Sequence, residues 1–293
     1  MRSLALLAAA VFWAAPAASA RKPIRIVASE SFWGSIAAQL AGDRGTVTSI
    51  VANPAVDPHD YEPNASDARA LASSQVAILN GIGYDGWASR LLAADPSDGR
   101  VVVDAGRVLG LKTGDNPHQW YSPAAVRRMV AAILAGLQRA DPRDARVFAE
   151  NARRFQARSL ARYDALRREI RRRFAGVPVG YSESMFEPLG ADLGLQLVTP
   201  PSFANAVAEG GDLTAGDVQT VERQARDRQI AVWIYDSQNL TPEVQRVNAI
   251  AADERIPTVS MTETLEPAGA TFESWQAAQL ERLLAALHLA TGR

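Results

Sequence analysis

Residues 24–51, IRIVASESFWGSIAAQLAGDRGTVTSIV, decide the fold class of this 293-residue chain. Residues 24–28 predict a strand, residues 32–40 predict a helix that ends at Gly42, and residues 46–51 predict a second strand. Because strand, helix and strand follow one another with short connections, the stretch has the pattern of a parallel α/β unit.

The same alternation continues toward the C-terminus. The next predicted elements are helix 66–73, strand 76–80, helix 87–94 and strand 101–104. Ser66 is the expected N-terminal cap of the first of these helices. Residues 106–121 are expected to form a loop, after which Pro123 begins a helix to about residue 139.

A second alternating half begins at Pro178. Its predicted elements are strand 177–181, helix 186–193, strand 195–198, a loop to Gly211, helix 214–228, strand 230–235, helix 242–252, strand 258–261 and helix 272–289. A weak repeat supports two similar halves, since ASESF at residues 28–32 resembles YSESMF at residues 181–186. We therefore predict an α/β fold of two lobes, each with a four-stranded parallel sheet flanked by helices.

One long, rigid helix is expected to join the lobes, because residues 143–174 contain neither glycine nor proline. Its arginines are interleaved with Glu150, Asp164 and Glu169, which is typical of a solvated helix face. A nucleic-acid surface is the alternative for this run, but the net charge of −1 gives no support to a nucleic-acid partner. The expected boundaries are residues 21–140 for the N-terminal lobe, 141–175 for the linking helix and 176–293 for the C-terminal lobe.

The N-terminus has the three parts of a secretory signal peptide at residues 1–20. These are Arg2, an apolar run at residues 4–15 and the A-x-A cleavage sequence at residues 18–20. The absence of cysteine excludes disulfides, thiolate metal ligands and a lipid-modified N-terminal cysteine. We expect a soluble, monomeric protein of the periplasm that is not inserted in the membrane.

Two histidines each follow a proline in a predicted loop. Residues 53–64, NPAVDPHDYEPN, hold His59 among three prolines, and residues 115–120, DNPHQW, contain His118. Prolines restrict the backbone on both sides of His59, and a metal ligand must be held within a few tenths of an ångström of its ion. A proline-rich turn with a merely solvated histidine remains the alternative.

Four candidate ligands lie where parallel strands end, which is where doubly wound sheets bind ligands. They are His59, His118, Glu183 and Glu263. Two imidazoles and two carboxylates suit a divalent transition metal. Spacing alone does not distinguish these acids from the other nearby carboxylates, which are Asp57, Asp60, Glu62, Asp85, Asp115 and Asp236.

Each candidate also has a structural explanation. Glu183 can be a cap of the following helix, and Glu263 can be a solvated acid in a turn. The third histidine, His288, lies near the end of the last predicted helix, where it favours the helix dipole and needs no metal.

Several motifs closely resemble the metal-binding solute-binding proteins of ABC importers, the zinc and manganese family. They are DPHDYEP at residues 57–63, NGIGYDGW at 80–87, NPHQW at 116–120, TPPSF at 199–203, NAVAEG at 205–210 and VSMTETL at 259–265. The resemblance covers nearly the whole chain after residue 20. It implies that His59 and His118 bind one divalent ion from the first lobe, that Glu183 and Glu263 complete the site from the second, and that a membrane permease receives the ion.

Two departures from the family pattern bear on the cargo. Many zinc-specific members have a histidine where this chain has Glu183 and a histidine-rich loop before the second ligand, and both absences resemble the manganese-type members. Many relatives also have aspartate where this chain has Glu263. We therefore expect one manganese or zinc ion as cargo, with a preference for manganese, and no enzymatic activity. The alternatives are a periplasmic zinc-dependent hydrolase and a carrier of metal chelates.

Overall fold

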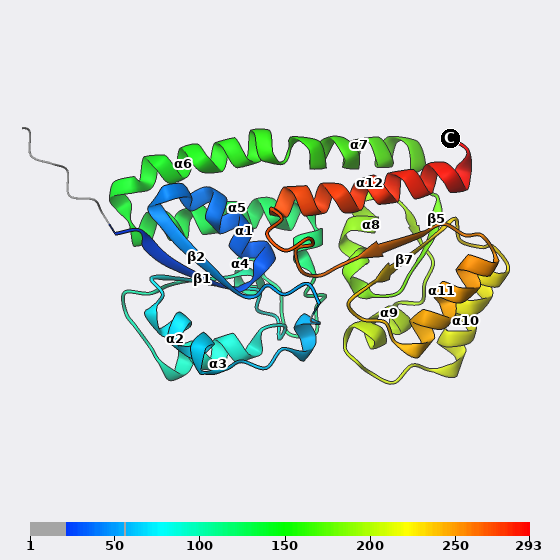
Figure 1. Cartoon of the computed structure of the whole chain (residues 1–293), viewed down its shortest axis with the longest axis horizontal. Helices are drawn as coiled ribbons and strands as arrows, with labels where there is room; N and C mark the ends of the chain where they lie inside the picture. Colours follow the sequence, from blue (N-terminus) through cyan, green and yellow to red (C-terminus); the bar gives the residue numbers. More distant parts are fainter. Residues whose placement is uncertain (1–21, 56) are drawn as a thin grey trace, which may run out of the picture.

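The computed structural model describes residues 22–55 and 57–293, so the predicted signal peptide lies outside the described part of the chain. The described residues form two α/β lobes that lie side by side (Figure 1). Each lobe contains one four-stranded sheet whose strands are all parallel. The predicted fold class is therefore confirmed.

Both sheets have the same strand order, β2-β1-β3-β4 in the N-terminal lobe and β6-β5-β7-β8 in the C-terminal lobe. The strands are β1 Ile24–Glu30, β2 Gly45–Val51, β3 Val76–Leu79, β4 Val101–Asp104, β5 Pro178–Tyr181, β6 Gln196–Leu197, β7 Val232–Asp236 and β8 Thr258–Met261. This shared order agrees with the weak sequence repeat. In each sheet the chain adds strands first toward one edge and then toward the other, and the change lies between the neighbouring strands β1 and β3, or β5 and β7. Such a change of direction opens a crevice at the carboxyl ends of the two strands.

Helices cover both faces of each sheet. Around the N-terminal sheet they are α1 Ser31–Ala41, α2 Ala65–Ser73, α3 Gly86–Ala94, α4 Ala105–Leu109 and α5 Pro123–Ala140, and around the C-terminal sheet α8 Glu187–Leu193, α9 Pro201–Ala208, α10 Ala215–Arg226 and α11 Pro242–Asp253. Two of them, α4 and α9, lie in segments that were predicted to be loops. They were missed because each is too short for an apolar periodicity to be recognised.

The start of α2 also differs from the prediction. Asn64, not Ser66, is the N-terminal cap, and its side chain accepts a hydrogen bond from the Ser66 backbone N–H at 2.7 Å. The Asp67 carboxylate in turn accepts from the Asn64 backbone N–H at 2.8 Å, which completes a capping box.

The connection between the lobes is not one unbroken helix. It consists of α6 Ala145–Arg154, a π-helical turn Phe155–Ser159 and α7 Ala161–Phe174. The Leu160 backbone N–H donates to the Phe155 carbonyl at 3.0 Å, five residues back, so the helix widens at this point. The prediction was wrong here because a π turn needs neither glycine nor proline. Helix α6 packs on α1 and α5, whereas α7 packs on α8.

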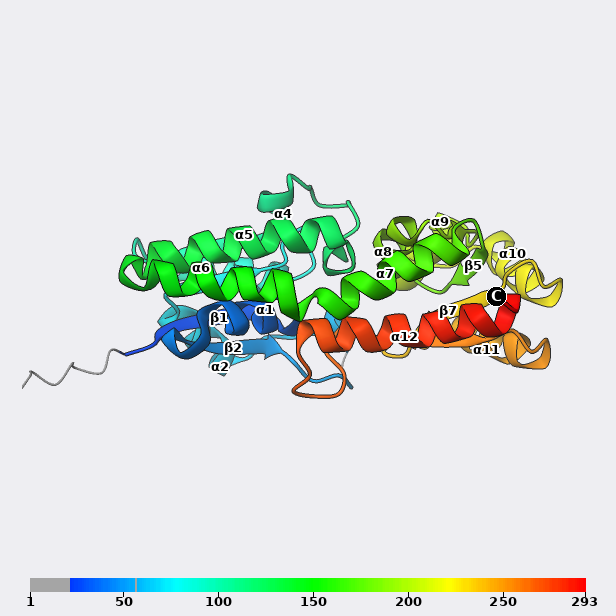
Figure 2. The same cartoon turned by 90° about the horizontal axis from the view of Figure 1, so that it is seen from above.

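A second helix also joins the two lobes. Helix α12, Phe272–Thr291, begins against the N-terminal lobe, where the Phe272 backbone N–H donates to Ser35 Oγ at 2.8 Å and Gln39 Nε2 donates to Glu273 at 2.8 Å. It then runs beside α7 along the C-terminal lobe (Figures 1 and 2). One apolar core is continuous through both lobes and includes Ile26, Leu166, Val232 and Leu280. None of the helices in the described residues is both long and apolar enough to cross a membrane.

Candidate metal centre

The structure brings the four predicted side chains together between the lobes. His59 lies in a 3₁₀ turn, Pro58–Asp60, that follows β2, and His118 lies in the loop after α4. Glu183 follows β5 and Glu263 follows β8, so each lobe contributes two side chains. One ligand atom from each residue lies within 4.8 Å of the other three.

The distances match a set of donors arranged around one point. His118 Nε2 lies 3.1 Å from Glu263 Oε1, His59 Nε2 lies 3.4 Å from the same oxygen, and the two Nε2 atoms are 3.4 Å apart. Three of the residues are buried, and the His59 side chain is 23% exposed. His59 is therefore on the side of the cluster that faces solvent.

The orientation of His118 is set by Asn116. The Asn116 Nδ2 donates to the Ser184 carbonyl at 2.8 Å and to Glu187 Oε2 at 3.2 Å, so its Oδ1 must face the imidazole. That oxygen lies 2.9 Å from His118 Nδ1 and accepts its hydrogen. Nε2 is therefore the nitrogen that faces the cluster, 3.1 Å from Glu263 Oε1, and it would offer its lone pair to a metal once it carries no proton.

Two contacts hold His59 itself within its loop. Asp57 Oδ1 accepts a hydrogen bond from the His59 backbone N–H at 2.9 Å, which caps the 3₁₀ turn. The imidazole lies edge-on to the Tyr84 ring, with centroids 4.7 Å apart. Burial lowers the pKa of His59, but the surrounding carboxylates, Glu263 foremost and then Asp57 and Asp236, outweigh this effect and the pKa lies above its ordinary value.

Glu183 is a buried carboxyl group whose neighbour is a second acid, Asp236. It is 1% exposed, and neither of its carboxylate oxygens accepts a hydrogen bond from the described residues, although the Asp236 carboxyl lies beside it. Burial, together with the negative charges of Glu263 and Asp236, raises the pKa of Glu183 well above its ordinary value. The raised pKa means that ionising Glu183 is unfavourable in its buried position. A cation at the centre of the cluster would stabilise the ionised carboxylate, since a buried charge is strongly destabilising only while it is unpaired.

Glu263 is fixed more firmly. Tyr84 Oη donates a short hydrogen bond to its Oε2, and its backbone N–H donates to Gln238 Oε1 at 2.6 Å. Burial alone raises the pKa of Glu263, but the two imidazoles, His118 foremost, reverse that effect and hold the pKa far below its ordinary value. Glu263 therefore stays ionised beside the imidazoles.

The competing carboxylates lie outside the four-residue cluster. Asp57 caps the His59 turn, Asp85 accepts from Ser29 Oγ and from the Asn80 backbone N–H, and Asp115 accepts from the Lys112 backbone N–H. Asp60 and Glu62 are exposed, and Asp236 lies beside Glu183. His288 lies near the end of α12, where its ring meets Phe174 with centroids 5.1 Å apart.

Sequence reasoning missed the residues that support the cluster. Asn116, Tyr84 and Gln238 carry no spacing signal of their own. Glu30 does carry a signal in the sequence, since the weak repeat aligns it with Glu183. Its side chain is 1% exposed and its Oε2 has no hydrogen-bond partner among the described residues.

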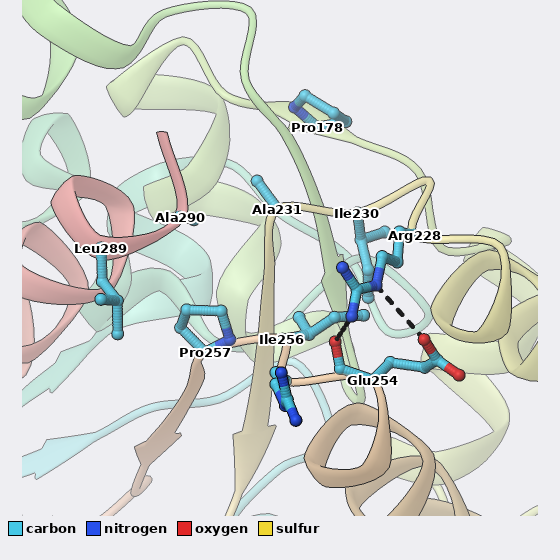
Figure 3. Close-up of a pocket in the computed structure, with 10 residues that line it drawn as sticks. Pro178, Arg228, Ile230, Ala231, Glu254, Ile256, Pro257, Leu289 and Ala290 are labelled. Carbon is cyan, nitrogen blue, oxygen red and sulfur yellow. Dashed lines mark hydrogen bonds and ion pairs between the residues drawn. The ribbon is translucent and has the colours of Figure 1, made fainter. Parts of the chain in front are cut away.

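A pocket of the C-terminal lobe lies away from this cluster (Figure 3). It is lined by residues at the amino ends of β5, β7 and β8, among them Pro178, Ala231 and Pro257, whereas Glu183 and Glu263 follow the carboxyl ends of β5 and β8. In Figure 3 the Arg228 guanidinium donates to the Glu254 carboxylate at 3.2 Å. The pocket and the cluster are thus at opposite ends of one sheet.

Comparison with known proteins gives relatives that bind metals. A family model described as zinc-uptake complex component A, periplasmic, matches residues 26–286. The manganese-binding lipoprotein MntA of Halalkalibacterium halodurans is 35% identical over 136 residues, 44% of this chain and 44% of that protein. The iron-binding protein YfeA of Yersinia pestis is 28% identical over 188 residues, 60% of this chain and 59% of that protein. In these alignments the chain spans about half the length of the relatives that it matches.

Solved structures are similar over a larger share of the chain. The manganese-bound periplasmic metal-binding protein of Candidatus Liberibacter asiaticus superposes with a TM-score of 0.74 at 19% identity, covering 90% of this chain and 99% of that chain. A crystal structure of ZnuA covers the same shares with a TM-score of 0.70 at 20% identity. These likenesses show the two-lobed fold. Because the family model matches most of its length, the chain belongs to the family of the periplasmic zinc-uptake component, ZnuA.

Proposed function

We propose that this protein is the solute-binding component of an ABC importer, which captures one divalent transition metal ion between its lobes in the periplasm and delivers it to a membrane permease. The observation that carries the proposal is the convergence of His59, His118, Glu183 and Glu263 within 4.8 Å, two from each lobe. An ion bound to all four would hold the lobes together, since each lobe alone offers only half of the ligands.

The donor set favours manganese as the physiological cargo. Two carboxylates supply hard oxygen donors and two negative charges, which suit manganese, whereas imidazole suits zinc and iron as well. Affinity for one site normally rises from manganese toward zinc, so zinc can bind more tightly in vitro. Relatives described as manganese-binding, such as MntA, and as iron-binding, such as YfeA, agree with a cargo of this class.

Capture explains the site better than catalysis does. A catalytic zinc keeps one coordination position for water and has a base beside it. Here four protein side chains surround one point and only His59 is partly exposed, so little room is left for a substrate. The chain also lacks the H-E-x-x-H sequence of many zinc hydrolases. Turnover of a peptide or ester by the metal-loaded protein would favour the hydrolase, and loss of metal together with small chelators would favour a chelate carrier.

Histidine variants test the assignment of the ligands. His59→Ala and His118→Ala should each lower metal affinity at least about 100-fold, because each removes one nitrogen that would bind the ion. His288→Ala is the matched control, since this histidine lies on α12 outside the cluster, and it should bind like the wild type. Metal content and affinity would be measured by elemental analysis and competition with a chromogenic chelator. Equal affinities in all three variants would rule the proposed site out.

The choice of cargo needs a separate experiment. Manganese and zinc would be titrated in competition while the melting temperature is followed, and uptake of each metal would be measured in cells with and without the gene. Zinc is expected to bind more tightly in the purified protein, and manganese uptake is expected to depend on the gene. Loss of zinc uptake with unchanged manganese uptake would reverse the assignment of the cargo.

A further inference from the structure

Gln238 lies in the loop after β7, and its side chain forms several hydrogen bonds beside the candidate metal centre. Its Oε1 accepts hydrogen bonds from the backbone N–H groups of Glu263 at 2.6 Å and Thr264 at 3.1 Å. Its Nε2 donates to Thr264 Oγ1 at 2.8 Å and to the Pro54 carbonyl at 3.0 Å. Both ends of the side-chain amide are therefore engaged.

One of these contacts crosses between the lobes. Pro54 belongs to the loop that follows β2 and leads to His59, whereas Gln238 and Glu263 belong to the C-terminal lobe. A single amide thus joins the loop of one metal ligand to the peptide group of another. We call this set of contacts, from Pro54 through Gln238 to Glu263 and Thr264, the Gln238 bridge.

The orientation of the amide is determined by its partners. Oε1 faces two backbone N–H donors and Nε2 faces the Pro54 carbonyl, so a reversed amide would lose these three hydrogen bonds. The backbone of Gln238 is fixed as well, because its N–H donates to Asp236 Oδ1 at 2.8 Å. Movement of the His59 loop away from the C-terminal lobe must therefore break the contact to Pro54.

We propose that Gln238 is a positioning residue that joins the His59 loop to Glu263 and thereby slows the escape of the bound ion. The proposal rests on the function proposed above and adds a residue that does not touch the metal. Separation of the lobes breaks the Gln238 bridge at its Pro54 contact and moves His59 away from Glu263 in the same step. The permease would have to break this bridge to receive the ion.

The test compares metal release from Gln238→Met with release from the wild type. Methionine has a similar volume but cannot form the hydrogen bonds, so the cluster keeps its four ligands and loses the bridge. Release of bound manganese into excess chelator should become about tenfold faster, as expected for the loss of one or two net hydrogen bonds. Gln245→Met is the matched control, since Gln245 is an exposed residue of the same lobe whose Nε2 also donates to one backbone carbonyl, and its release rate should equal that of the wild type.

Hydrogen exchange distinguishes loss of the Gln238 bridge between the lobes from an effect that is confined to the C-terminal lobe. In Gln238→Met, backbone amides of residues 53–61 in the N-terminal lobe should exchange faster, although the substitution is in the C-terminal lobe. Unchanged manganese release in this variant, or faster release with unchanged exchange of residues 53–61, would overturn the proposal. If Gln238→Met does not fold, Gln238→Asn provides the same comparison, because its shorter side chain cannot span from Glu263 to Pro54. Failure of the wild type to retain metal would instead refute the proposed function.

Discussion

At the scale of single residues, hydrogen bonds from neighbouring side chains orient His118 and Glu263 of the cluster. Asn116 does so for His118, because its Oδ1 lies 2.9 Å from Nδ1 and Nε2 is the nitrogen that faces the other three side chains. Such supporting residues affect metal affinity nearly as much as the ligands themselves.

Substitution of Asn116 measures that contribution. Asn116→Ala should lower metal affinity about 10–100-fold, because His118 Nδ1 loses its acceptor and the ring can rotate. Asn116→Asp keeps an acceptor at the same place and should retain more of the affinity than the alanine variant. Chelator competition gives both constants. Equal affinity of Asn116→Ala and the wild type would mean that the imidazole is oriented by packing alone.

The titratable groups of the cluster predict a pH dependence of binding. The pKa of His59 lies above its ordinary value, and the pKa of Glu183 lies well above its own, so the metal-free protein holds protons that the ion must displace. Raising the pH through these pKa values removes the competing protons, and affinity should increase from about pH 6 to about pH 8. Calorimetry in buffers of different ionisation enthalpy should detect proton release on binding. Constant affinity over that range, without proton release, would contradict this account.

At the scale of secondary-structure elements, short-range capping decides where α2 begins after the His59 loop. The side chain of Asn64 accepts from the Ser66 backbone N–H, so Asn64→Ala should lower the free energy of unfolding by about 1 kcal/mol. Ser66→Ala is the control and should change it much less, because its hydroxyl is not the cap. Urea denaturation of both variants checks the difference, and a larger loss from Ser66→Ala would restore the prediction made from the sequence.

The connection between the lobes shows a different limit of element prediction. The run without glycine or proline correctly indicated helix at residues 145–154 and 161–174, but not the π turn at residues 155–159. A π turn follows from how α6 packs on the N-terminal lobe while α7 packs on the C-terminal lobe, and no single residue type encodes it.

At the scale of the whole molecule, one apolar core extends through both lobes. We therefore expect a single unfolding transition in calorimetry, with equal calorimetric and van't Hoff enthalpies, although the fold has two sheets. Metal at a thousandfold excess over its dissociation constant should raise the stability of that transition by about 4.1 kcal/mol if only the folded state binds. Two separate transitions, of which metal shifts only one, would show that the lobes unfold independently.

The sequence by itself determined the two-lobed α/β class and pointed to His59 and His118 as candidate metal ligands. It did so because strand and helix periodicities are local, and because prolines beside His59 and His118 mark loops at strand ends. It did not distinguish Glu183 and Glu263 from six other acids without the family resemblance, since spacing along a chain does not give distance across a cleft. Only the tertiary structure decided which atoms lie within 4.8 Å, how α12 joins the lobes, and that Gln238 bridges them. These are contacts between residues far apart in sequence, and they exist only once both lobes have packed on their shared core.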